Sequence, residues 1–317
     1  MFFVAYYWFF IFLFMTQTTI IVPGTTANIG VGFDCLGAAL TIYNEFQFAL
    51  AEGDHGLTIT VEGEEADHVG TDKTNLVYQS FFKLYQKIDR VPPSVEIVIK
   101  LGVPLARGLG SSATAIVAGL LGANHLAGHP LSGREIRDLA IAIEGHPDNV
   151  VPALLGNCQL SVGEAGNWQI CEIPWHQDIV PVVAIPNFEL STEEARAVLP
   201  TTYVRGDSIF NISRMGLLLR GLATNNQDWL AMALEDKLHQ PYRKKLIRGY
   251  DAVKAAAIAS GAYGLVISGA GPTLLALCDR GTENAVVASM SQAWKQEGIE
   301  ANVLSLALES RGLIDNE

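Results

Sequence analysis

The chain has 317 residues, of which 49% are hydrophobic, enough for one large domain or two ordinary ones. Its formal net charge of −12 argues against a general nucleic-acid binder, which usually carries a basic patch. The four cysteines, Cys35, Cys158, Cys171 and Cys278, include no CxxC pair, which favours reduced thiols over a zinc site or a disulfide framework. We therefore expect a cytoplasmic protein with no nucleic-acid partner.

The first 15 residues form an uncharged apolar run, MFFVAYYWFFIFLFM. A membrane-spanning helix needs about 20 such residues, so this run is short for a span. It also lacks the basic start and the small-residue cleavage site of a secretory signal. We interpret residues 1–15 as an extension that lies outside the fold. It either results from an upstream start codon called in error or is dispensable, and we favour this over a membrane anchor. We expect no membrane partner.

Hydrophobic patterning in the first half of the chain predicts strands and helices in mixed order. Pro23 and Gly24 predict a turn after the first strand. Strands are predicted at residues 18–22, 57–61 and 95–103. One helix is predicted after a cap at Thr74 and another at residues 113–127. A third follows a capping box of Ser132 and Glu135 and runs toward Glu144.

The second half is richer in helical patterns, and its strands do not alternate regularly with helices. Strands are predicted at residues 179–185, up to Ser268, at 273–278 and at 301–306. Helices are predicted after a capping box of Ser191 and Glu194, and at residues 208–222, 228–238, 243–260 and 283–296.

This order favours an α+β protein over a doubly wound dinucleotide fold, which would repeat βαβ units. Residues 150–169 contain three glycines and few helix signals, so we expect a domain boundary within that segment. The resulting division is an N-terminal domain of residues 16–160 and a C-terminal domain of residues 161–317.

Residues 104–114, PLARGLGSSAT, join the strand predicted at 95–103 to the helix predicted at 113–127. Glycines let backbone N–H groups approach an anion closely, and a helix N-terminus favours negative charge. The segment is not a Walker loop, because no Gly-Lys-[Ser/Thr] follows the glycines. It therefore predicts a phosphate-binding loop of another type.

The same loop resembles the P-x-x-x-G-L-G-S-S-A motif of the GHMP kinases, the family of galactokinase and of homoserine, mevalonate and phosphomevalonate kinases. Two further family motifs match, PGTTANIGVGFDCLGAAL at residues 23–40 and ISGAGPTLLAL at 267–277. Segments at 146–152 (HPDNVVP), 191–200 (STEEARAVLP) and 241–243 (PYR) are similar to those of the homoserine kinases within that family.

The resemblance implies a two-domain GHMP fold, with an N-terminal ribosomal-protein-S5-like domain and a C-terminal ferredoxin-like α/β sandwich. It implies an ATP-dependent kinase that phosphorylates the hydroxyl of L-homoserine to O-phospho-L-homoserine, a step toward threonine. A homodimer is an open possibility. The ATP-binding residues would be Pro104, Leu105, Ala106, Arg107, Gly108, Leu109, Gly110, Ser111, Ser112, Ala113 and Thr114.

Five residues within the matching motifs correspond to the family's substrate contacts. Arg196 and Arg243 match two arginines for the substrate carboxylate, which the planar guanidinium can bind in a bidentate way. Asn28, Asp34 and His146 match contacts to the rest of the substrate. Each has a structural alternative, such as a solvated arginine, an Asx turn or a histidine at a helix end. The third motif, 268–272, would be a supporting turn.

Mg²⁺ is expected with ATP, since a hard cation bridges phosphates through oxygen ligands and waters. By resemblance Ser112 and a helix carboxylate would hold it. The family often writes E-x-E-G here, but the chain has Ala142-Ile143-Glu144-Gly145. Glu144 is therefore our candidate ligand, with Asp138 as the alternative.

Thr192 and Asn149 are the candidate catalytic residues, although Thr192 equally suits simple capping of a helix. The sequence contains no Ser-His-Asp order and no HRD loop, so no general base is evident. Positioning and electrostatic stabilisation are sufficient for phosphoryl transfer. A kinase acting on another small alcohol and a non-catalytic metabolite binder are the alternatives.

Overall fold

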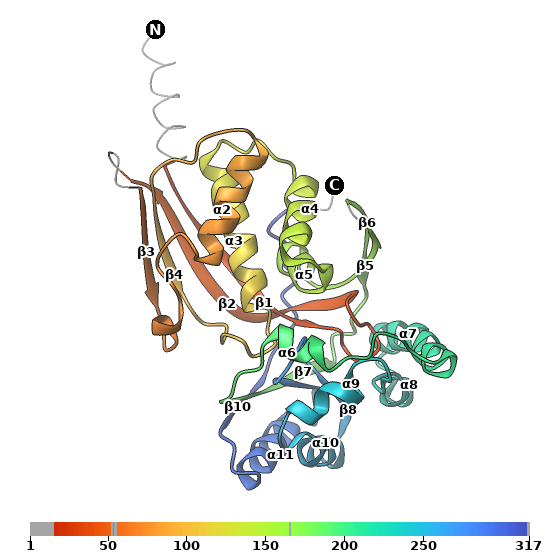
Figure 1. Ribbon diagram of the computed structural model, residues 1–317. Helices are drawn as coiled ribbons and strands as arrows, with labels where there is room; N and C mark the ends of the chain where they lie inside the picture. Colours follow the sequence, from red (N-terminus) through yellow and green to blue (C-terminus); the bar gives the residue numbers. More distant parts are fainter. Residues whose placement is uncertain (1–15, 52, 54–55, 165, 316–317) are drawn as a thin grey trace.

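The computed structural model describes residues 16–51, 53, 56–164 and 166–315, and within them two β-sheets each carry helices (Figure 1). The predicted apolar extension, residues 1–15, lies outside the described residues. None of the helices within the described ranges is both long and apolar enough to cross a membrane.

The N-terminal sheet has the strand order β3-β4-β2-β5-β6, and β1 pairs with β2 off this path. All of its pairs are antiparallel except β3 with β4. Its strands are β1 (Gln17–Ala27), β2 (Leu36–Leu50), β3 (Leu57–Glu62), β4 (Val95–Lys100), β5 (Cys158–Glu164) and β6 (Asn167–Ile173).

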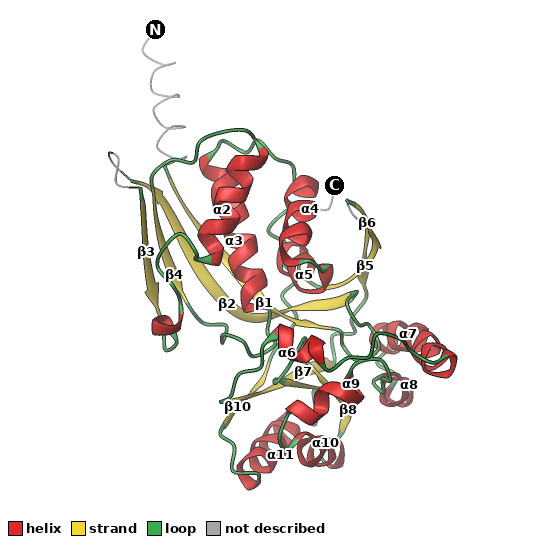
Figure 2. Ribbon diagram, in the orientation of Figure 1, coloured by secondary structure: helices red, strands yellow, loops and turns green. Residues whose placement is uncertain are grey.

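Four helices cover one face of this sheet (Figure 2). They are α2 (Leu76–Lys87), α3 (Ser111–Leu126), α4 (Gly133–Glu144) and α5 (Pro147–Leu155), and a 3₁₀ turn, η1 (Ala66–His68), follows β3. Aromatic and aliphatic side chains such as Phe46, Phe48, Phe81, Ile116 and Leu120 fill the space between sheet and helices and are almost fully buried. Burial of this apolar area is the main force that stabilises the layer.

The C-terminal sheet has the order β10-β7-β9-β8, with every pair antiparallel. Its strands are β7 (Ile179–Pro186), β8 (Ala262–Ile267), β9 (Leu274–Asp279) and β10 (Ala301–Ser305). The accompanying helices are α6 (Thr192–Ala197), α7 (Arg205–Thr224), α8 (Gln227–Ala233), α9 (Gln240–Arg243), η2 (Lys244–Leu246), α10 (Tyr250–Ala259) and α11 (Glu283–Gln296).

A shared apolar cluster joins the two sheets. Leu36 and Leu40 of β2 pack in one cluster with Val183 of β7, Leu275 of β9 and Leu218 of α7, all with 0% exposure. The domains therefore meet through a continuous core, which fixes the geometry of the space between them.

The predicted α+β arrangement is confirmed, as are the strands of β3 and β7, the helix α11 and both capping boxes. Ser132 accepts a hydrogen bond from the Glu135 N–H while the Glu135 side chain accepts one from the Ser132 N–H, and Ser191 with Glu194 repeats the pattern. These capping boxes are predictable from the sequence because each one supplies hydrogen bonds to N–H groups that the helix start leaves unpaired.

Several predicted boundaries are wrong. Pro23 and Gly24 do not form a turn; they lie within β1, where the pairing shifts between Pro23 and Thr25. The cap of α2 is Asn75, which accepts a hydrogen bond from the Val77 N–H, and not Thr74. The strand predicted at 95–103 ends at Lys100.

Two helical predictions in the second half were too long. The one at 228–238 ends at Ala233. The one at 243–260 is divided between α9 and α10 by a 3₁₀ turn and Gly249, which has a φ of 79°. The segment 150–169 is not poor in helix, since α5 covers its start.

The strand β2 and the β5–β6 hairpin were not predicted. The hairpin pairs with β2, so the first sheet continues to Ile173. On this pairing we propose a domain boundary just after Ile173, later than the expected division at residue 160.

Candidate active site

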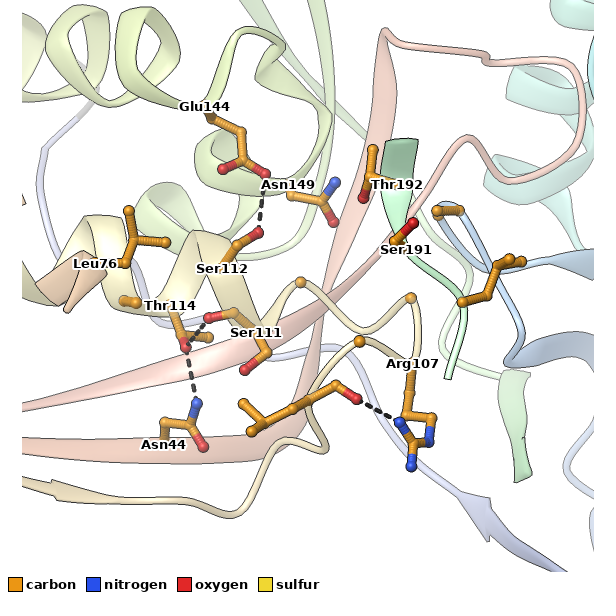
Figure 3. A pocket seen from close by; sticks show the side chains of 18 of the residues that line it. Asn44, Leu76, Arg107, Ser111, Ser112, Thr114, Glu144, Asn149, Ser191 and Thr192 are labelled. Atoms are coloured by element: carbon orange, nitrogen blue, oxygen red, sulfur yellow. Dashed lines mark hydrogen bonds between the residues drawn. The ribbon is translucent and has the colours of Figure 1, made fainter. Parts of the chain in front are cut away.

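A cavity of about 440 Å³ lies between the two domains, against the loop that starts α3 (Figure 3). The cavity is lined by every predicted substrate-binding, catalytic and metal-binding residue, and by most of the predicted ATP-binding loop. The exceptions in that loop are Pro104, Leu109 and Ala113, and the alternative metal ligand Asp138 also does not line the cavity. Leu109 and Ala113 are instead fully buried in the core.

The loop before α3 leaves backbone donors facing the cavity. Gly108 and Gly110 have φ values of 75° and 69°, and a Cβ on either would collide with Ser268 or Thr25. Only glycine suits both the conformation and the space. The N–H groups of residues 111–113 make no hydrogen bond within the described part of the chain. Unpaired N–H groups at the positive end of a 16-residue helix suit an anion.

The C-terminal glycine turn supports this loop from behind. Ser268 Oγ donates to the Gly108 carbonyl at 2.7 Å, and the Thr273 N–H donates to the Arg107 carbonyl at 3.2 Å. Gly269 N–H bonds to Ala27, which ties the first motif to the third. The three sequence motifs are thus joined in one structure. These contacts agree with the supporting role expected for the turn.

Arg107 points its guanidinium at protein groups. It donates to the carbonyls of Pro186 and Leu105 at 3.1 and 2.8 Å, and lies 3.5 Å from Glu65 and 3.3 Å from Glu189. The side chain is 10% exposed. Arg107 therefore holds the loop against both domains, which makes a positioning role more consistent with its contacts than direct phosphate binding.

Ser112 and Glu144 lie together at the edge of the cavity. Ser112 Oγ donates to Glu144 Oε1 at 3.1 Å (Figure 3). Burial raises the pKa of Glu144, against the opposing effects of His146 and of the Ser112 hydrogen bond. The alternative, Asp138, is bound by Arg137 at 2.9 Å.

A hydroxyl and a carboxylate side by side suit a hard cation that prefers oxygen. Within the described residues there is no group of three or more His, Cys, Asp or Glu that could hold a metal. A cation here would therefore depend on nucleotide phosphates and water for its remaining ligands.

Opposite charges gather at the other side of the cavity. Arg196 donates from Nη1 and Nη2 to the two carboxylate oxygens of Asp34, at 3.1 and 2.7 Å. Arg243 is 2% exposed and donates to the carbonyls of Ala195 and Gly269 at 3.0 and 3.1 Å. Both arginines line the same cavity, so their remaining N–H donors can face one ligand.

Asn28 shapes the backbone beside these charges. Its Nδ2 donates to the Gly269 carbonyl at 2.8 Å and its Oδ1 accepts from the Asp34 N–H at 2.9 Å. Asn28 and Asp34 have φ values of 70° and 58°, which asparagine and aspartate adopt more easily than most residues. Asn28 thereby orients Asp34 toward Arg196.

His146, Asp148 and Asn149 start helix α5. His146 Nδ1 lies 2.8 Å from Asp148 Oδ1, and Thr25 Oγ1 donates to Asn149 Oδ1 at 2.8 Å. Burial opposes protonation of His146, but the hydrogen bond and charge of Asp148 outweigh it and raise the pKa of His146. Asp148 stands inside the HPDNVVP motif and was assigned no binding or catalytic role from the sequence, but it lines the cavity with His146 and Asn149.

Thr192 is the first residue of α6, and Ser191 is the cap. Ser191 Oγ accepts from the Glu194 N–H, so capping is already satisfied without Thr192. Among the hydrogen bonds made by the described residues, none uses the Thr192 hydroxyl. The capping alternative for Thr192 is therefore wrong, and its hydroxyl is free to meet a ligand in the cavity (Figure 3).

The apolar end of the cavity was not predicted from the sequence. It is lined by Phe46, Val69, Leu76, Val77, Ile99 and Leu101. These residues come from β2, β4, the start of α2 and the loops near them, and no motif in the sequence marks them as a site.

The family models agree with this architecture. The one described as "GHMP kinases N terminal domain" matches residues 75–157, and "GHMP kinases C terminal" matches residues 213–296. The chain belongs to the GHMP kinase family, and the predicted two-domain GHMP fold is confirmed.

Curated homoserine kinases are similar to this chain over nearly its whole length. The chain is 64% identical over 300 residues to the homoserine kinase of Crocosphaera subtropica, covering 94% of this chain and 97% of the relative. It is 55% identical over 296 residues to that of Thermosynechococcus vestitus, covering 93% and 97%.

Solved structures carry the same fold. A homoserine kinase from Cytophaga hutchinsonii matches with a TM-score of 0.85 at 27% identity, over 94% of this chain and 96% of that one. L. major mevalonate kinase matches with a TM-score of 0.72 at 15% identity, over 94% and 98%, which shows the fold alone.

Proposed function

We propose that the protein is an ATP-dependent homoserine kinase, which transfers the γ-phosphate of ATP to the hydroxyl of L-homoserine. The observation that carries this proposal is the juxtaposition of a phosphate loop with Asp34, Arg196 and Arg243 in one cavity. An amino acid is a zwitterion, and this set offers a carboxylate for its ammonium and guanidinium groups for its carboxylate.

The nucleotide would lie along the loop. The free N–H groups of residues 111–113 suit the ATP phosphates, and the apolar end of the cavity suits a flat nucleobase. The amino acid would then occupy the charged end, with its hydroxyl directed toward the loop. This arrangement supplies the proximity on which phosphoryl transfer depends.

We propose Mg²⁺ as the accompanying cation, held by Ser112 and Glu144. When bound, it would bridge the phosphates and neutralise charge that develops during transfer. The support from this chain is the pairing of Ser112 Oγ with Glu144 Oε1 at 3.1 Å, beside the free N–H groups of the loop.

The reaction would rest on positioning more than on a strong base. Asp34 already accepts from Arg196, and Asp148 accepts from His146 or Asn149, so neither carboxylate is reserved as a base for the attacking hydroxyl. Thr192 and Asn149 line the cavity beside them and would orient the attacking hydroxyl. A loose transition state for phosphoryl transfer requires little more than alignment and charge stabilisation.

A cytoplasmic location and a homodimer are further parts of the proposal. The four cysteines are all free, which suits a reducing compartment. Size-exclusion chromatography with light scattering would test the homodimer, and a mass of one chain would contradict it.

A coupled ADP-release assay tests the function. The purified protein is given Mg-ATP with L-homoserine, mevalonate, galactose or shikimate in turn. We expect turnover with L-homoserine and product recovery as O-phospho-L-homoserine by mass spectrometry. Turnover with one of the other alcohols and none with L-homoserine would reject the assignment.

A further inference from the structure

Phe33 does not itself line the cavity, but it contacts both arginines at the charged end of the cavity. The Cζ atom of Arg243 lies over its ring at 5.1 Å from the centroid, and that of Arg196 at 5.8 Å. His239 stacks on the same ring, with centroids 5.0 Å apart and planes 20° apart. One half-buried phenylalanine therefore contacts both arginines and a buried histidine.

His239 gives this ring a rigid, neutral support. It is 0% exposed, and its Nε2 lies 2.7 Å from the Gly30 carbonyl, which can only accept, so Nε2 carries the proton. Its Nδ1 has no hydrogen-bond partner within the described chain. Burial lowers the pKa of His239, so the imidazole adds no positive charge beneath the two arginines.

The segment that carries His239 is itself fixed. Asp236, buried to 7% exposure, accepts hydrogen bonds from the backbone N–H groups of Leu238, His239 and Gln240 and from the Asn211 side chain. The stack on Phe33 thus rests on a backbone that cannot easily shift.

The two guanidinium groups need such support because they repel each other. Burial and the neighbouring Arg196 charge lower the pKa of Arg243. Asp34 and two carbonyls hold some of their nitrogens, but the face of each guanidinium needs a partner that leaves its edge donors free. An aromatic ring attracts a cation through its face and consumes no N–H donor.

We propose that Phe33 is a positioning residue that holds Arg196 and Arg243 at the separation required by an α-amino-acid carboxylate. This inference rests on the proposed function and adds a determinant of substrate specificity to it. Phe33 does not touch the reacting atoms; it acts through the two arginines.

The test compares Phe33→Leu, which removes the ring, with Phe33→Tyr, which keeps it. We expect the KM for L-homoserine to rise about tenfold in Phe33→Leu and to stay within about twofold of wild type in Phe33→Tyr. The KM for ATP should be unchanged in both variants, and kcat should change less than the homoserine KM. Phe33→Met provides a second ring-free variant in case the leucine form folds poorly.

Phe210→Leu is the matched control. Phe210 also lies beneath two cations, with Arg214 Cζ at 3.3 Å and Lys237 Nζ at 4.7 Å, but neither of these cations lines the cavity. We expect Phe210→Leu to lower the melting temperature without raising the homoserine KM. A double-mutant cycle adds a second readout, since Phe33→Leu should have little further effect on KM in an Arg196→Ala, Arg243→Ala background.

The outcomes separate the two proposals. Wild-type activity with an unchanged homoserine KM in both Phe33→Leu and Phe33→Met overturns the role of Phe33 and leaves the proposed function intact. An equal rise in KM for ATP, or a similar rise in Phe210→Leu, also overturns it. Absence of wild-type homoserine phosphorylation overturns both proposals.

Discussion

Arg196 and Arg243 reach the same cavity but are held in different ways. Arg243 is almost completely buried and tied to two carbonyls, whereas the Arg196 side chain is 38% exposed and paired with a carboxylate. Replacing Arg243 removes the side-chain donor of the Ala195 carbonyl, whereas the Gly269 carbonyl keeps its hydrogen bond from Asn28. Replacing Arg196 leaves Asp34 without its ion-pair partner in a half-exposed position. Replacing either residue should therefore raise the KM for L-homoserine, but the two replacements should differ in how far they lower the free energy of unfolding.

We predict that Arg196→Ala and Arg243→Ala each raise the KM for L-homoserine about ten- to a hundredfold, with the KM for ATP nearly unchanged. The loss of a charge-assisted hydrogen bond is worth about 1.5–3 kcal/mol. Arg243→Ala should also lower the free energy of unfolding by about 1–3 kcal/mol, because the carbonyl of buried Ala195 loses its side-chain donor. Steady-state kinetics and thermal unfolding measure both effects, and parallel rises for the two substrates would argue against a carboxylate clamp.

The adjacent serines of the phosphate loop give a second prediction at this scale. Ser112→Ala should lower kcat more than it weakens homoserine binding, because its hydroxyl lies beside Glu144 at the proposed cation site. Ser111→Ala keeps the backbone N–H that faces the cavity and is the natural control. Normal turnover and magnesium dependence in Ser112→Ala, with both lost in Ser111→Ala, would mean that the ligand is the other serine.

The location of individual residues at the cavity was predictable where they lie in a family motif, as for Asp34, Arg196 and Ser112. Contacts across the fold were not. Nothing in the sequence reveals that Arg107 pairs with Glu65 and Glu189, or that Phe33 stacks on His239, 206 positions later. Those contacts arise from packing of distant segments, which local patterns do not encode.

At the scale of elements, the conformation of the phosphate loop is the critical feature. We predict that Gly110→Ala lowers the free energy of unfolding by about 1–2 kcal/mol or more and reduces kcat. The substitution forces a side chain into the left-handed region and against Thr25. Thermal or denaturant unfolding together with kcat measures the effect.

Gly216→Ala is the control for that experiment. Gly216 lies within α7 with nothing within 4 Å of an added Cβ, so alanine there should stabilise the helix by about 0.5–1 kcal/mol. Stability of Gly110→Ala equal to that of Gly216→Ala would show that the loop tolerates a side chain.

Elements with strong local signals were predictable, including the capping boxes that begin α4 and α6. The helix α9 was not separated from α10, because the break consists of the short 3₁₀ turn η2 and of Gly249, which has a positive φ. The long strand β2 was missed because residues 37–39 near its start are Gly-Ala-Ala, and its strand character comes from pairing with β1, β4 and β5.

For the whole molecule, buried His239 links folding stability to pH. Its charged neighbours are Asp236 and Asp34, which raise its pKa, and Arg243, which lowers it; burial dominates and the net shift is downward. The native state therefore stays neutral where the unfolded chain, with a histidine pKa of about 6.5, already binds a proton. Stability must fall as pH drops below about 6.5, by at most about 1.4 kcal/mol per pH unit from this group.

Comparison of wild type with His239→Gln tests this linkage. The glutamine can still donate to the Gly30 carbonyl but does not titrate. We expect urea unfolding between pH 7 and 5 to show a steeper loss of stability in wild type than in the variant. Identical slopes would mean that His239 does not bind its proton differently in the two states.

The domain arrangement followed from the sequence only through the family motifs. Composition and patterning indicated an α+β protein. They did not indicate that Leu36, Val183 and Leu218 share one core. This shared core brings the phosphate loop and the two arginines to opposite sides of one cavity. Long-range packing of this kind decides the position of the site and has no local signature.

The most direct test of the central claim gives the wild-type protein L-homoserine and two analogues that each lack one charged group. L-Homoserine carries both charged groups, 4-hydroxybutanoate lacks the ammonium group and 3-aminopropan-1-ol lacks the carboxylate. If Asp34, Arg196 and Arg243 recognise a zwitterion, kcat/KM should fall at least tenfold for each analogue relative to L-homoserine, since each loses a charge-assisted contact. Equal kcat/KM values for the three alcohols would contradict the account.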